Sequence, residues 1–429
     1  MLRLNNAQPQ PIGLDIGHDG IKMLQMEVTP GNSLAVVAAA RCVFPGEVRG
    51  DHGLRMASAV DLIKRTLRQQ PFRGREVVAA LPREIVHVKN LRLPQMPPAE
   101  IEQAVQFEAP NVFPFAVDKA KIHYLPAGEV RQGADVRQEV IVFAVKNDDV
   151  NNYLELLHRA GVVVRSLDIE PCALFRTVDR FIRRREDEQQ VTVLVDVGWR
   201  RSQVVIGRGR DINFVKPVEI GGHQLQEAVA KKLGITAEEA QALRQRLCES
   251  EASGEETGGR RDPVRQSVFD ATRAIAEELG REIALCLRYY SVAFRGQRPG
   301  RLRLVGGEAS NTQLQQILNA VLPIPAEIGK PLCSTDTSRM RAVDRQGPMS
   351  EWALALGLSL KMAKGPFAPR DGTPRDRNAP AVEVTPSGVQ VMDADQLVRS
   401  ISGPVGNEPA GRSVGAVKEP VLAGEVTNA

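Results

Sequence analysis

The chain has 429 residues, which allows two to four domains at roughly 100–200 residues each. Hydrophobic residues make up 42% and charged residues 25%, as in a globular protein with an ample core. The 56 Lys and Arg against 52 Asp and Glu leave a net charge of only +4, which argues against a nucleic-acid partner. No apolar run approaches the roughly 20 residues of a membrane helix, and the N-terminus shows no secretory signal pattern.

The cysteines and histidines show no metal-binding or disulfide pattern. The five cysteines lie far apart without a CxxC pair, at Cys42, Cys172, Cys248, Cys286 and Cys333. The six histidines are scattered, and none pair at the spacing of a zinc site. Neither a zinc site nor a disulfide framework is therefore expected, and a reducing cytoplasm fits this cysteine usage.

The first half of the chain predicts an α/β lobe that opens with three consecutive strands. These strands are rich in Val, Ile and Leu and are separated by turn residues, at 11–16, 21–28 and 34–43. A helix follows, because apolar residues recur at spacings of three and four at Met56, Val60, Ile63 and Leu67. The other predicted elements are strands 77–81, 86–93, 138–144 and 163–168, and helices that begin at Pro97 and near Val150.

The same order of elements starts again in the second half of the chain. Three more strands are predicted at 192–196, 203–207 and 211–217. Helices are predicted at 224–232, 237–247 and 269–294. The folded part is expected to close with strand 301–305, helix 311–321, strand 324–328 and helix 351–361.

Two segments lack the apolar residues that a packed core requires. Residues 249–266 are polar and contain Gly and Pro, so they predict a flexible insertion between two helices. Residues 363–429 are rich in Pro and Gly, with Phe367 as their only aromatic residue. Because such a segment cannot bury enough apolar surface to offset its ordering entropy, we expect a disordered C-terminal tail.

A short motif occurs once in each half of the chain. An apolar strand ends in Asp, an aliphatic residue and Gly at Asp15–Gly17 and again at Asp196–Gly198, and each copy leads through a turn into a second strand. This repetition predicts two similar α/β domains that face each other. The alternative is a duplicated scaffold in which the glycines serve only tight turns.

Phosphate binding would explain this motif. Glycine lets the backbone approach phosphates closely, and turn N–H groups form an anion-binding nest. An Asp at a strand end can hold Mg²⁺ through water, which singles out Asp15 and Asp196. Lys22 can reach a phosphate as a point charge. A third glycine loop, at 305–310, joins a strand to a helix and suits the adenosine end of a nucleotide.

Longer motifs make the sequence resemble the actin-like ATPase superfamily, which includes FtsA, and more closely the PilM family of type IV pilus assembly proteins. The motifs are Pro94-x-Met96-Pro97, then Phe107-Glu108-Ala109 and Phe113-Pro114-Phe115, with further matching stretches between 11 and 362. The resemblance implies a duplicated actin-like (ribonuclease H-like) fold of two α/β lobes, at 1–190 and 191–362. It also implies a small α+β subdomain inserted in the first lobe at about 85–146.

The resemblance further implies ATP and Mg²⁺ between the lobes, with Asp15 and Asp196 facing the metal ion. The residues that would contact the nucleotide are Gly17, His18, Asp19, Gly20, Lys22, Gly198, Trp199, Arg200, Arg201, Gly221, Gly222, Gln241, Arg244, Gly306, Gly307 and Glu308. Several depart from the family pattern. His18 and Asp19 replace hydroxyl residues, Trp199 to Arg201 replace small residues, and Glu308 and Gln241 replace Gly and Glu. These departures leave ATP hydrolysis open.

The partner implied by the resemblance is the short cytoplasmic N-terminus of a PilN-like inner-membrane protein. Such a scaffold is cytoplasmic, is related to the cytoplasmic part of GspL, and reaches the membrane only through its partner. Phe107, Phe113 and Phe115 either pack in the core of the inserted subdomain or anchor the partner peptide. The alternatives are an active ATPase or sugar-kinase-like phosphotransferase, and a filament-forming protein like FtsA. Whether the protein forms a homo-oligomer is left open.

Overall fold

Two β-sheets with the same strand order form the framework of the protein. The strands of the first sheet are β1 (Gln8–Ile16), β2 (Gly20–Val28), β3 (Leu34–Val43), β4 (Glu76–Ala80), β8 (Val163–Asp168) and β14 (Thr335–Asp336), in the order β14-β3-β2-β1-β4-β8. The strands of the second sheet are β9 (Val191–Val197), β10 (Ser202–Arg208), β11 (Asp211–Val218), β12 (Leu302–Val305) and β13 (Ala326–Ile328), in the order β11-β10-β9-β12-β13. In both sheets the first strand pairs antiparallel with the second and parallel with the fourth. The repeated motif therefore corresponds to a repeated sheet topology.

The structure is a computed structural model that describes residues 8–29, 31–132, 135–252, 262–294, 298–364 and 367. All of these residues belong to one compact unit. Most of the predicted tail at 363–429 lies outside the described residues. However, Ala363 and Phe367 are buried in a hydrophobic core that includes residues of β2 and β3. The folded part therefore extends past the predicted end at 362.

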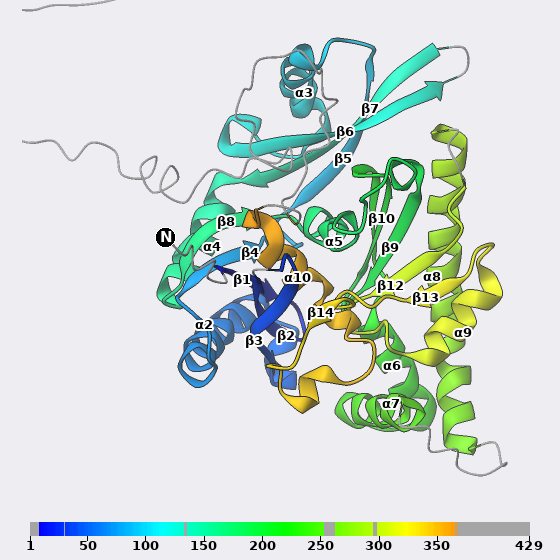
Figure 1. Cartoon of the computed structure of the whole chain (residues 1–429). Coiled ribbons are helices and arrows are strands. Elements are labelled where there is room, and N and C mark those ends of the chain that lie inside the picture. Colours follow the sequence, from blue (N-terminus) through cyan, green and yellow to red (C-terminus); the bar gives the residue numbers. More distant parts are fainter. Residues whose placement is uncertain are drawn as a thin grey trace, which may run out of the picture. The chain divides into compact units, whose positions relative to one another are not determined.

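Helices cover both faces of each sheet, which explains why the strands are apolar on both sides. Helices α2 (His52–Gln69) and α4 (Asn147–Arg159) cover the outer face of the first sheet, and α8 (Pro263–Ala293) and α9 (Thr312–Val321) cover the outer face of the second. Helices α5 (Glu170–Asp179) and α10 (Ala353–Ser359) form a central layer between the sheets (Figure 1). Every residue of α5 is buried there.

The two central helices are exchanged between the halves of the chain. Helix α5 follows β8 of the first sheet but contacts β10 and β11 of the second. Helix α10 comes from the second half but packs on β1, β2 and β4, and β14 extends the first sheet beside β3. The expected lobe boundary falls between residues 190 and 191, but α5 and α10 each pack on the sheet formed by the other half of the chain. Below, the first lobe means the first sheet with its covering helices, and the second lobe means the second sheet with its covering helices.

Glycine allows the two central helices to approach closely. A Cβ atom on Gly357 of α10 would lie 1.8 Å from the carbonyl oxygen of Ala173 in α5, and one on Gly13 of β1 would lie 2.0 Å from that of Ala355. Beside them, the Ser359 hydroxyl accepts a hydrogen bond from the Met26 amide at 3.1 Å and donates to the Pro11 carbonyl at 2.8 Å. The C-terminal helix is thereby fixed to the first sheet.

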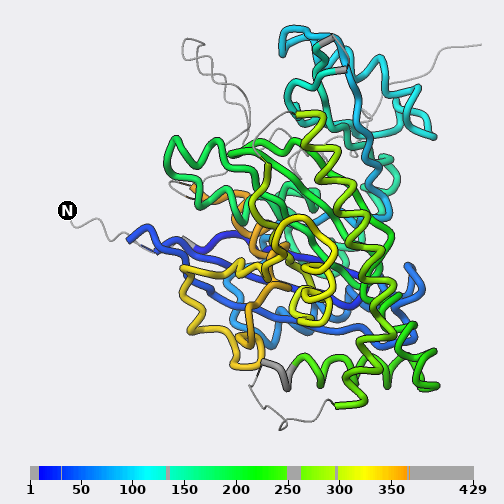
Figure 2. The backbone as a smooth tube through the Cα atoms, turned by 90° about the vertical axis from the view of Figure 1, so that its right-hand side faces the viewer, coloured from blue at the N-terminus to red at the C-terminus, as the bar shows by residue number. Residues whose placement is uncertain are grey.

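The second lobe extends through two further helices, α6 (Gly222–Leu233) and α7 (Ala237–Ala252). Gly234 follows α6 in the left-handed conformation at φ 67°, which ends the helix. Helix α8 runs along the second sheet from the inserted subdomain to α6 (Figure 2). It begins at Pro263, where the Asp262 side chain caps its first turn. The structured helices thus extend into both ends of the predicted insertion at 249–266, and residues 253–261 lie outside the described residues.

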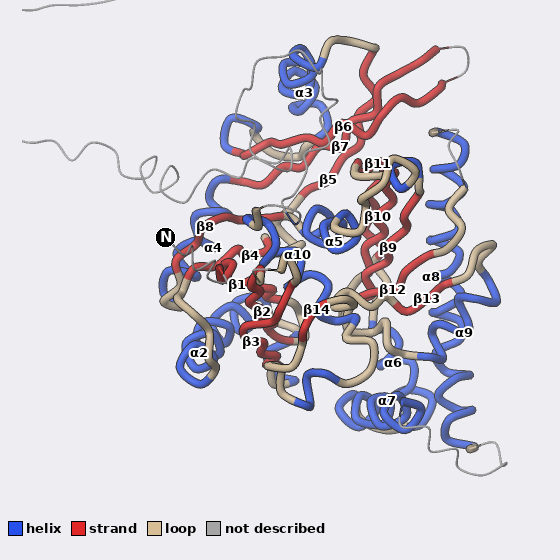
Figure 3. The backbone as a smooth tube through the Cα atoms, in the orientation of Figure 1, coloured by secondary structure: helices blue, strands red, loops and turns tan. Residues whose placement is uncertain are grey.

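The inserted subdomain has a sheet of its own, in the order β5-β7-β6 (Figure 3). Its strands are β5 (His87–Pro94), β6 (Ala120–Gln132) and β7 (Asp135–Lys146), with helix α3 (Pro98–Val112) packed on one face. These bounds lie close to the expected 85–146. Strand β6 was not predicted, although its first residues, Ala120–Tyr124, alternate between apolar and polar.

We predict that Gly357→Ala destabilises the protein by about 3 kcal/mol or more, because the added methyl group would collide with backbone rather than with a movable side chain. Gly300→Ala is the control, since no atom lies within 4 Å of a Cβ built there; it should change the free energy of unfolding by less than about 0.5 kcal/mol. Urea unfolding measures both variants. Equal free energies of unfolding for Gly357→Ala and Gly300→Ala would contradict the close packing of α5 on α10.

Candidate functional site

One large cavity, of about 1380 Å³, lies between the two lobes and is lined by residues of both. We call it the interlobe cavity. Its lining includes these predicted site residues: Asp15, Gly17, His18, Asp19, Gly20, Lys22, Asp196, Gly198, Trp199, Arg200, Arg201, Gln241, Arg244, Gly306, Gly307 and Glu308. Gly221 and Gly222 lie behind this lining, where a Cβ atom would collide with the turn at Gly198–Arg201 or with the Glu308 carboxylate. The structure therefore brings the predicted residues of both motifs to one place.

The tips of the two repeated hairpins face each other in this cavity. The Gly17 amide donates to the Gly20 carbonyl at 2.9 Å, and the Gly198 amide donates to the Arg201 carbonyl at 3.2 Å, so both turns have the same form. The rings of His18 and Trp199 stack between the tips with centroids 6.3 Å apart. Trp199 also packs edge-on against His223, with ring centroids 4.6 Å apart. Aromatic side chains therefore lie where small residues were expected.

The two motif aspartates are buried, and each is paired with a cation. Lys22 lies opposite Asp15 in the β1–β2 pairing, and its Nζ is 3.5 Å from Asp15 Oδ2. Arg83 Nη2 contacts Asp196 Oδ2 and also Glu170 Oε1, and Arg83 Nη1 donates to the Arg201 carbonyl at 3.0 Å. Arg83 thereby joins the first lobe to the second. Burial raises the pKa of Asp196, and the charges of Arg83 and Lys22 oppose this shift.

The aspartates as placed do not fit a magnesium ion. A hard divalent cation needs carboxylate oxygens, or their waters, that are not already neutralised. Asp196 Oδ2 is taken by Arg83, and the backbone of Gly306 passes close to Asp196 Oδ1, where a Cβ atom would lie at 2.2 Å. On the opposite side of the cavity, Lys22 Nζ lies close to the Asp15 carboxylate. At the expected water-mediated Mg²⁺ site, one oxygen of each aspartate therefore faces a fixed side-chain cation.

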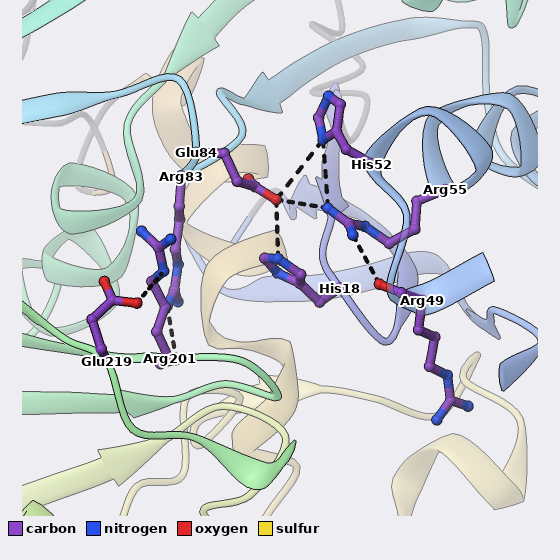
Figure 4. A network of polar contacts seen from close by, with 8 residues as sticks. All are labelled: His18, Arg49, His52, Arg55, Arg83, Glu84, Arg201 and Glu219. Atoms are coloured by element: carbon purple, nitrogen blue, oxygen red, sulfur yellow. Dashed lines mark hydrogen bonds and ion pairs between the residues drawn. The ribbon is translucent and has the colours of Figure 1, made fainter. Parts of the chain in front are cut away.

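Glu84 is the centre of a second polar network at the edge of the cavity. His18 Nε2 lies 3.0 Å and Arg55 Nη2 lies 2.7 Å from Glu84 Oε1, with His52 nearby (Figure 4). Burial favours the neutral form of Glu84, but the hydrogen bond from His18 and the charge of Arg55 outweigh it and lower its pKa to about 2. Burial lowers the pKa of His18, so its neutral ring donates to an ionised Glu84 at neutral pH.

Asp19 is neutralised by arginines rather than by a metal ion. Arg49 Nη1 lies 3.3 Å from Asp19 Oδ1, and Arg41 Nη2 lies 3.5 Å from Asp19 Oδ2. The same Arg49 nitrogen donates to Gln241 Oε1 in α7 at 2.6 Å. The expected ribose contact Gln241 thus has a protein partner across the mouth of the cavity.

The third glycine loop is built around two charged residues. Gly306 adopts φ 96°, a left-handed conformation that favours glycine. Glu308, where the resemblance led us to expect glycine, pairs with Arg244 Nη2 at 2.5 Å. Arg244 also donates to the Gly222 carbonyl at 3.3 Å. The negative charge of Glu308 is therefore compensated inside the cavity.

Sequence reasoning missed several residues of this site, among them Arg83, Glu84, Glu170 and Arg49. Three of them follow parallel strands: Arg83 and Glu84 come after β4, and Glu170 comes after β8. Ligand sites of open α/β sheets collect at the carboxyl ends of their strands, so this position was the available signal. Arg49 lies on the short helix α1 (Gly46–Arg49), and no local pattern marks it.

The three phenylalanines of the inserted subdomain lie in different environments. Phe113 is buried in the subdomain core, and Phe115 packs on it with ring centroids 5.7 Å apart. Phe107 is 76% exposed on α3. Of the three, Phe107 is the most exposed, whereas Phe115 is half-buried.

The repeated sheet order, the exchanged central helices and the cavity between the lobes define a duplicated actin-like protein. The chain belongs to the family described as type IV pilus assembly protein PilM, whose model matches residues 13–363. It is 25% identical to a chain of a solved PilM–PilN type IV pilus biogenesis complex, with a TM-score of 0.66 over 82% of this chain and 98% of that one.

More distant structural likenesses extend to other bacterial proteins. The ethanolamine utilization protein EutJ from Carboxydothermus hydrogenoformans is 12% identical, with a TM-score of 0.47 over 82% of this chain and 89% of that one. MreB 5 of Spiroplasma citri bound to AMPPNP is 10% identical, with a TM-score of 0.40 over 82% and 94% of the two chains. Within the described residues, no helix combines the length and apolar character needed to cross a membrane.

We predict that Glu84→Gln destabilises the protein by about 1–3 kcal/mol at neutral pH, because it leaves the buried Arg55 guanidinium without its ionised partner. The Glu84 carboxylate has a lower pKa in the folded state, about 2, than its ordinary 4.5. Its contribution is therefore complete above pH 4.5 and is lost as the pH falls towards 2. Urea unfolding of both proteins across this range measures the effect.

The control is Glu76→Gln, which removes an exposed carboxylate paired with Arg165. Such surface pairs contribute little, so this variant should stay within about 0.5 kcal/mol of the unaltered protein at every pH. A stability difference for Glu84→Gln that stays constant down to pH 2 would refute the assigned ionisation.

Proposed function

We propose that the protein is a cytoplasmic scaffold of type IV pilus assembly. It binds the short cytoplasmic N-terminus of a PilN-like inner-membrane protein and so reaches the membrane through its partner. The observation that carries this proposal is the match to the solved PilM–PilN complex, which spans 98% of that chain. The family match over residues 13–363 supports it.

The inserted subdomain offers the features that a peptide partner requires. Strands β5 and β6 are the edges of its sheet, and an edge strand can accept a further strand through its backbone groups. Phe107 on α3 supplies an exposed aromatic anchor beside this sheet. We therefore place the partner peptide on the subdomain, with Phe107 in contact with it.

ATP binding in the interlobe cavity is the second element of the proposal. The cavity is large enough for a nucleotide, and the turns at Gly17–Gly20 and Gly198–Arg201 bring backbone amides and Lys22 to it. The Trp199 indole nitrogen is buried without a hydrogen-bond partner among the described residues, so it adds a donor. A nucleotide between the lobes would set the angle between them.

We favour a binding protein over an ATPase or phosphotransferase. Transfer of a phosphoryl group needs a base or positioning residue beside the attacking oxygen. Glu170 lines the cavity, and its Oε2 has no hydrogen-bond partner among the described residues, but its other oxygen is held by Arg83. Glu84 is held by His18 and Arg55. Glu84 and one oxygen of Glu170 thus have structural partners.

We predict that a fluorescent peptide with the N-terminal cytoplasmic sequence of the PilN-like partner binds the full chain, as measured by fluorescence anisotropy. Phe107→Ala should weaken binding about 10-fold, the effect of losing an aromatic anchor. Leu54→Ala, which truncates an exposed apolar side chain on α2, should leave the affinity unchanged.

Absence of peptide binding would refute the scaffold proposal. Binding that is insensitive to Phe107→Ala would refute the placement of the peptide on α3 while keeping the partner.

A further inference from the structure

We propose that the guanidinium of Arg83 takes the place of the divalent cation in the interlobe cavity, so that the protein binds nucleotide phosphates without a metal ion. The choice of nucleotide phosphates as the ligand rests on the nucleotide binding proposed above. The absence of a metal site, however, can be tested with no nucleotide present.

The position of Arg83 carries the proposal. It follows β4 at the carboxyl end of the first sheet, and its side chain crosses the base of the cavity to the second lobe. One nitrogen, Nη2, contacts two carboxylates that come from different elements, Glu170 at the start of α5 and Asp196 in β9. These carboxylates are only 4% and 6% exposed. A single guanidinium thus bridges two buried carboxylates, as a divalent cation can; its one positive charge offsets one of their two negative charges, and the charge of Lys22 also acts on Asp196.

A second cation beside this guanidinium would face strong charge repulsion. A metal ion at Asp196 would have to displace Arg83, and the displaced guanidinium would remain in the same cavity, where like charges repel strongly. Lys22 already occupies the Asp15 side at 3.5 Å, and its charge also acts on Asp196. Both motif carboxylates therefore face fixed side-chain cations.

Fixed side-chain cations can also neutralise and position a bound polyphosphate, as a metal ion does. A guanidinium binds phosphate oxygens through paired N–H donors, and further donors of Arg83 remain beside its contacts to Glu170, Asp196 and the Arg201 carbonyl. Arg200 lines the same cavity, and its charge is felt by Arg55. A phosphate chain entering between the hairpin tips would meet Lys22, Arg83 and Arg200.

The first experiment measures Mn²⁺ binding to the full chain by electron paramagnetic resonance, without nucleotide. The unaltered protein should bind Mn²⁺ at least about 10-fold more weakly than Arg83→Met, because the variant leaves Glu170 and Asp196 unpaired and able to hold the ion. Adding Asp196→Asn to that variant should abolish the new Mn²⁺ binding.

Arg92→Met is the matched control for the loss of an arginine–carboxylate pair. Arg92 Nε donates to the buried Glu139 at 3.0 Å in the inserted subdomain, outside the cavity. This variant should bind Mn²⁺ no better than the unaltered protein. Tight Mn²⁺ binding by the unaltered protein that is lost in Asp196→Asn would overturn the proposal.

The second experiment uses the unaltered protein, so it does not depend on a variant that folds. Calorimetry with ATP should give the same affinity in MgCl₂ and in EDTA, within about threefold, equivalent to about 0.65 kcal/mol. A loss of more than about 10-fold in EDTA would overturn the proposal. If ATP binds in neither buffer, the nucleotide ligand is refuted together with the nucleotide element of the proposed function, whereas peptide binding would be unaffected.

Discussion

The contact of Arg83 with Glu170 and Asp196 is the interaction on which the arrangement of the two lobes depends. It joins the loop after β4 to α5 and to β9, and all three carry residues of the interlobe cavity. Because both carboxylates are buried, removing their cation would leave uncompensated charges, which typically costs about 3–5 kcal/mol. Two other contacts connect the lobes. His18 stacks on Trp199, and Arg49 donates a hydrogen bond to Gln241. The cavity is therefore bordered by one network of charge pairs and by further polar and aromatic contacts between the lobes.

The inserted subdomain is tied to the second lobe by a separate set of contacts. Tyr289 of α8 donates to the buried Glu139 carboxylate at 2.9 Å, and Arg92 donates to both residues. Asn213 of β11 donates to the Ala127 carbonyl at 2.7 Å. A peptide held on the subdomain would thus bind a part of the molecule that is inserted in the first lobe but anchored to the second. This geometry suits a scaffold in which the partner and the cavity both depend on how the lobes meet.

The duplicated fold could be predicted from the sequence because its signals are local. Apolar strands that end in Asp-x-Gly occur twice, and the structure places both at the same position of two equivalent sheets. The glycine loops were predictable for the same reason. By contrast, α10 and β14 pack on the first sheet although they lie in the second half of the chain, and no local pattern encodes that exchange. The burial of Phe113 likewise depends on how α3 folds over its sheet.

The chemistry of the cavity was less predictable than its location. The sequence indicates Asp15 and Asp196 as carboxylates at strand ends, but it does not show that Lys22 and Arg83 neutralise them. Glu308 and Gln241 stand out as departures from the family pattern, yet each has a compensating partner, Arg244 and Arg49, that lies far away in the chain. Charge pairs of this kind depend on tertiary contacts, so they emerge only when the lobes are placed together.

The most direct test of this account is a double-mutant cycle on the free energy of unfolding with Arg83→Met and Asp196→Asn. Residues in direct contact show coupling energies of about 0.5–3 kcal/mol, and we expect a value of about 2 kcal/mol for this buried pair. Additive effects, within about 0.5 kcal/mol, would mean that the two side chains do not meet between the lobes and would contradict the account.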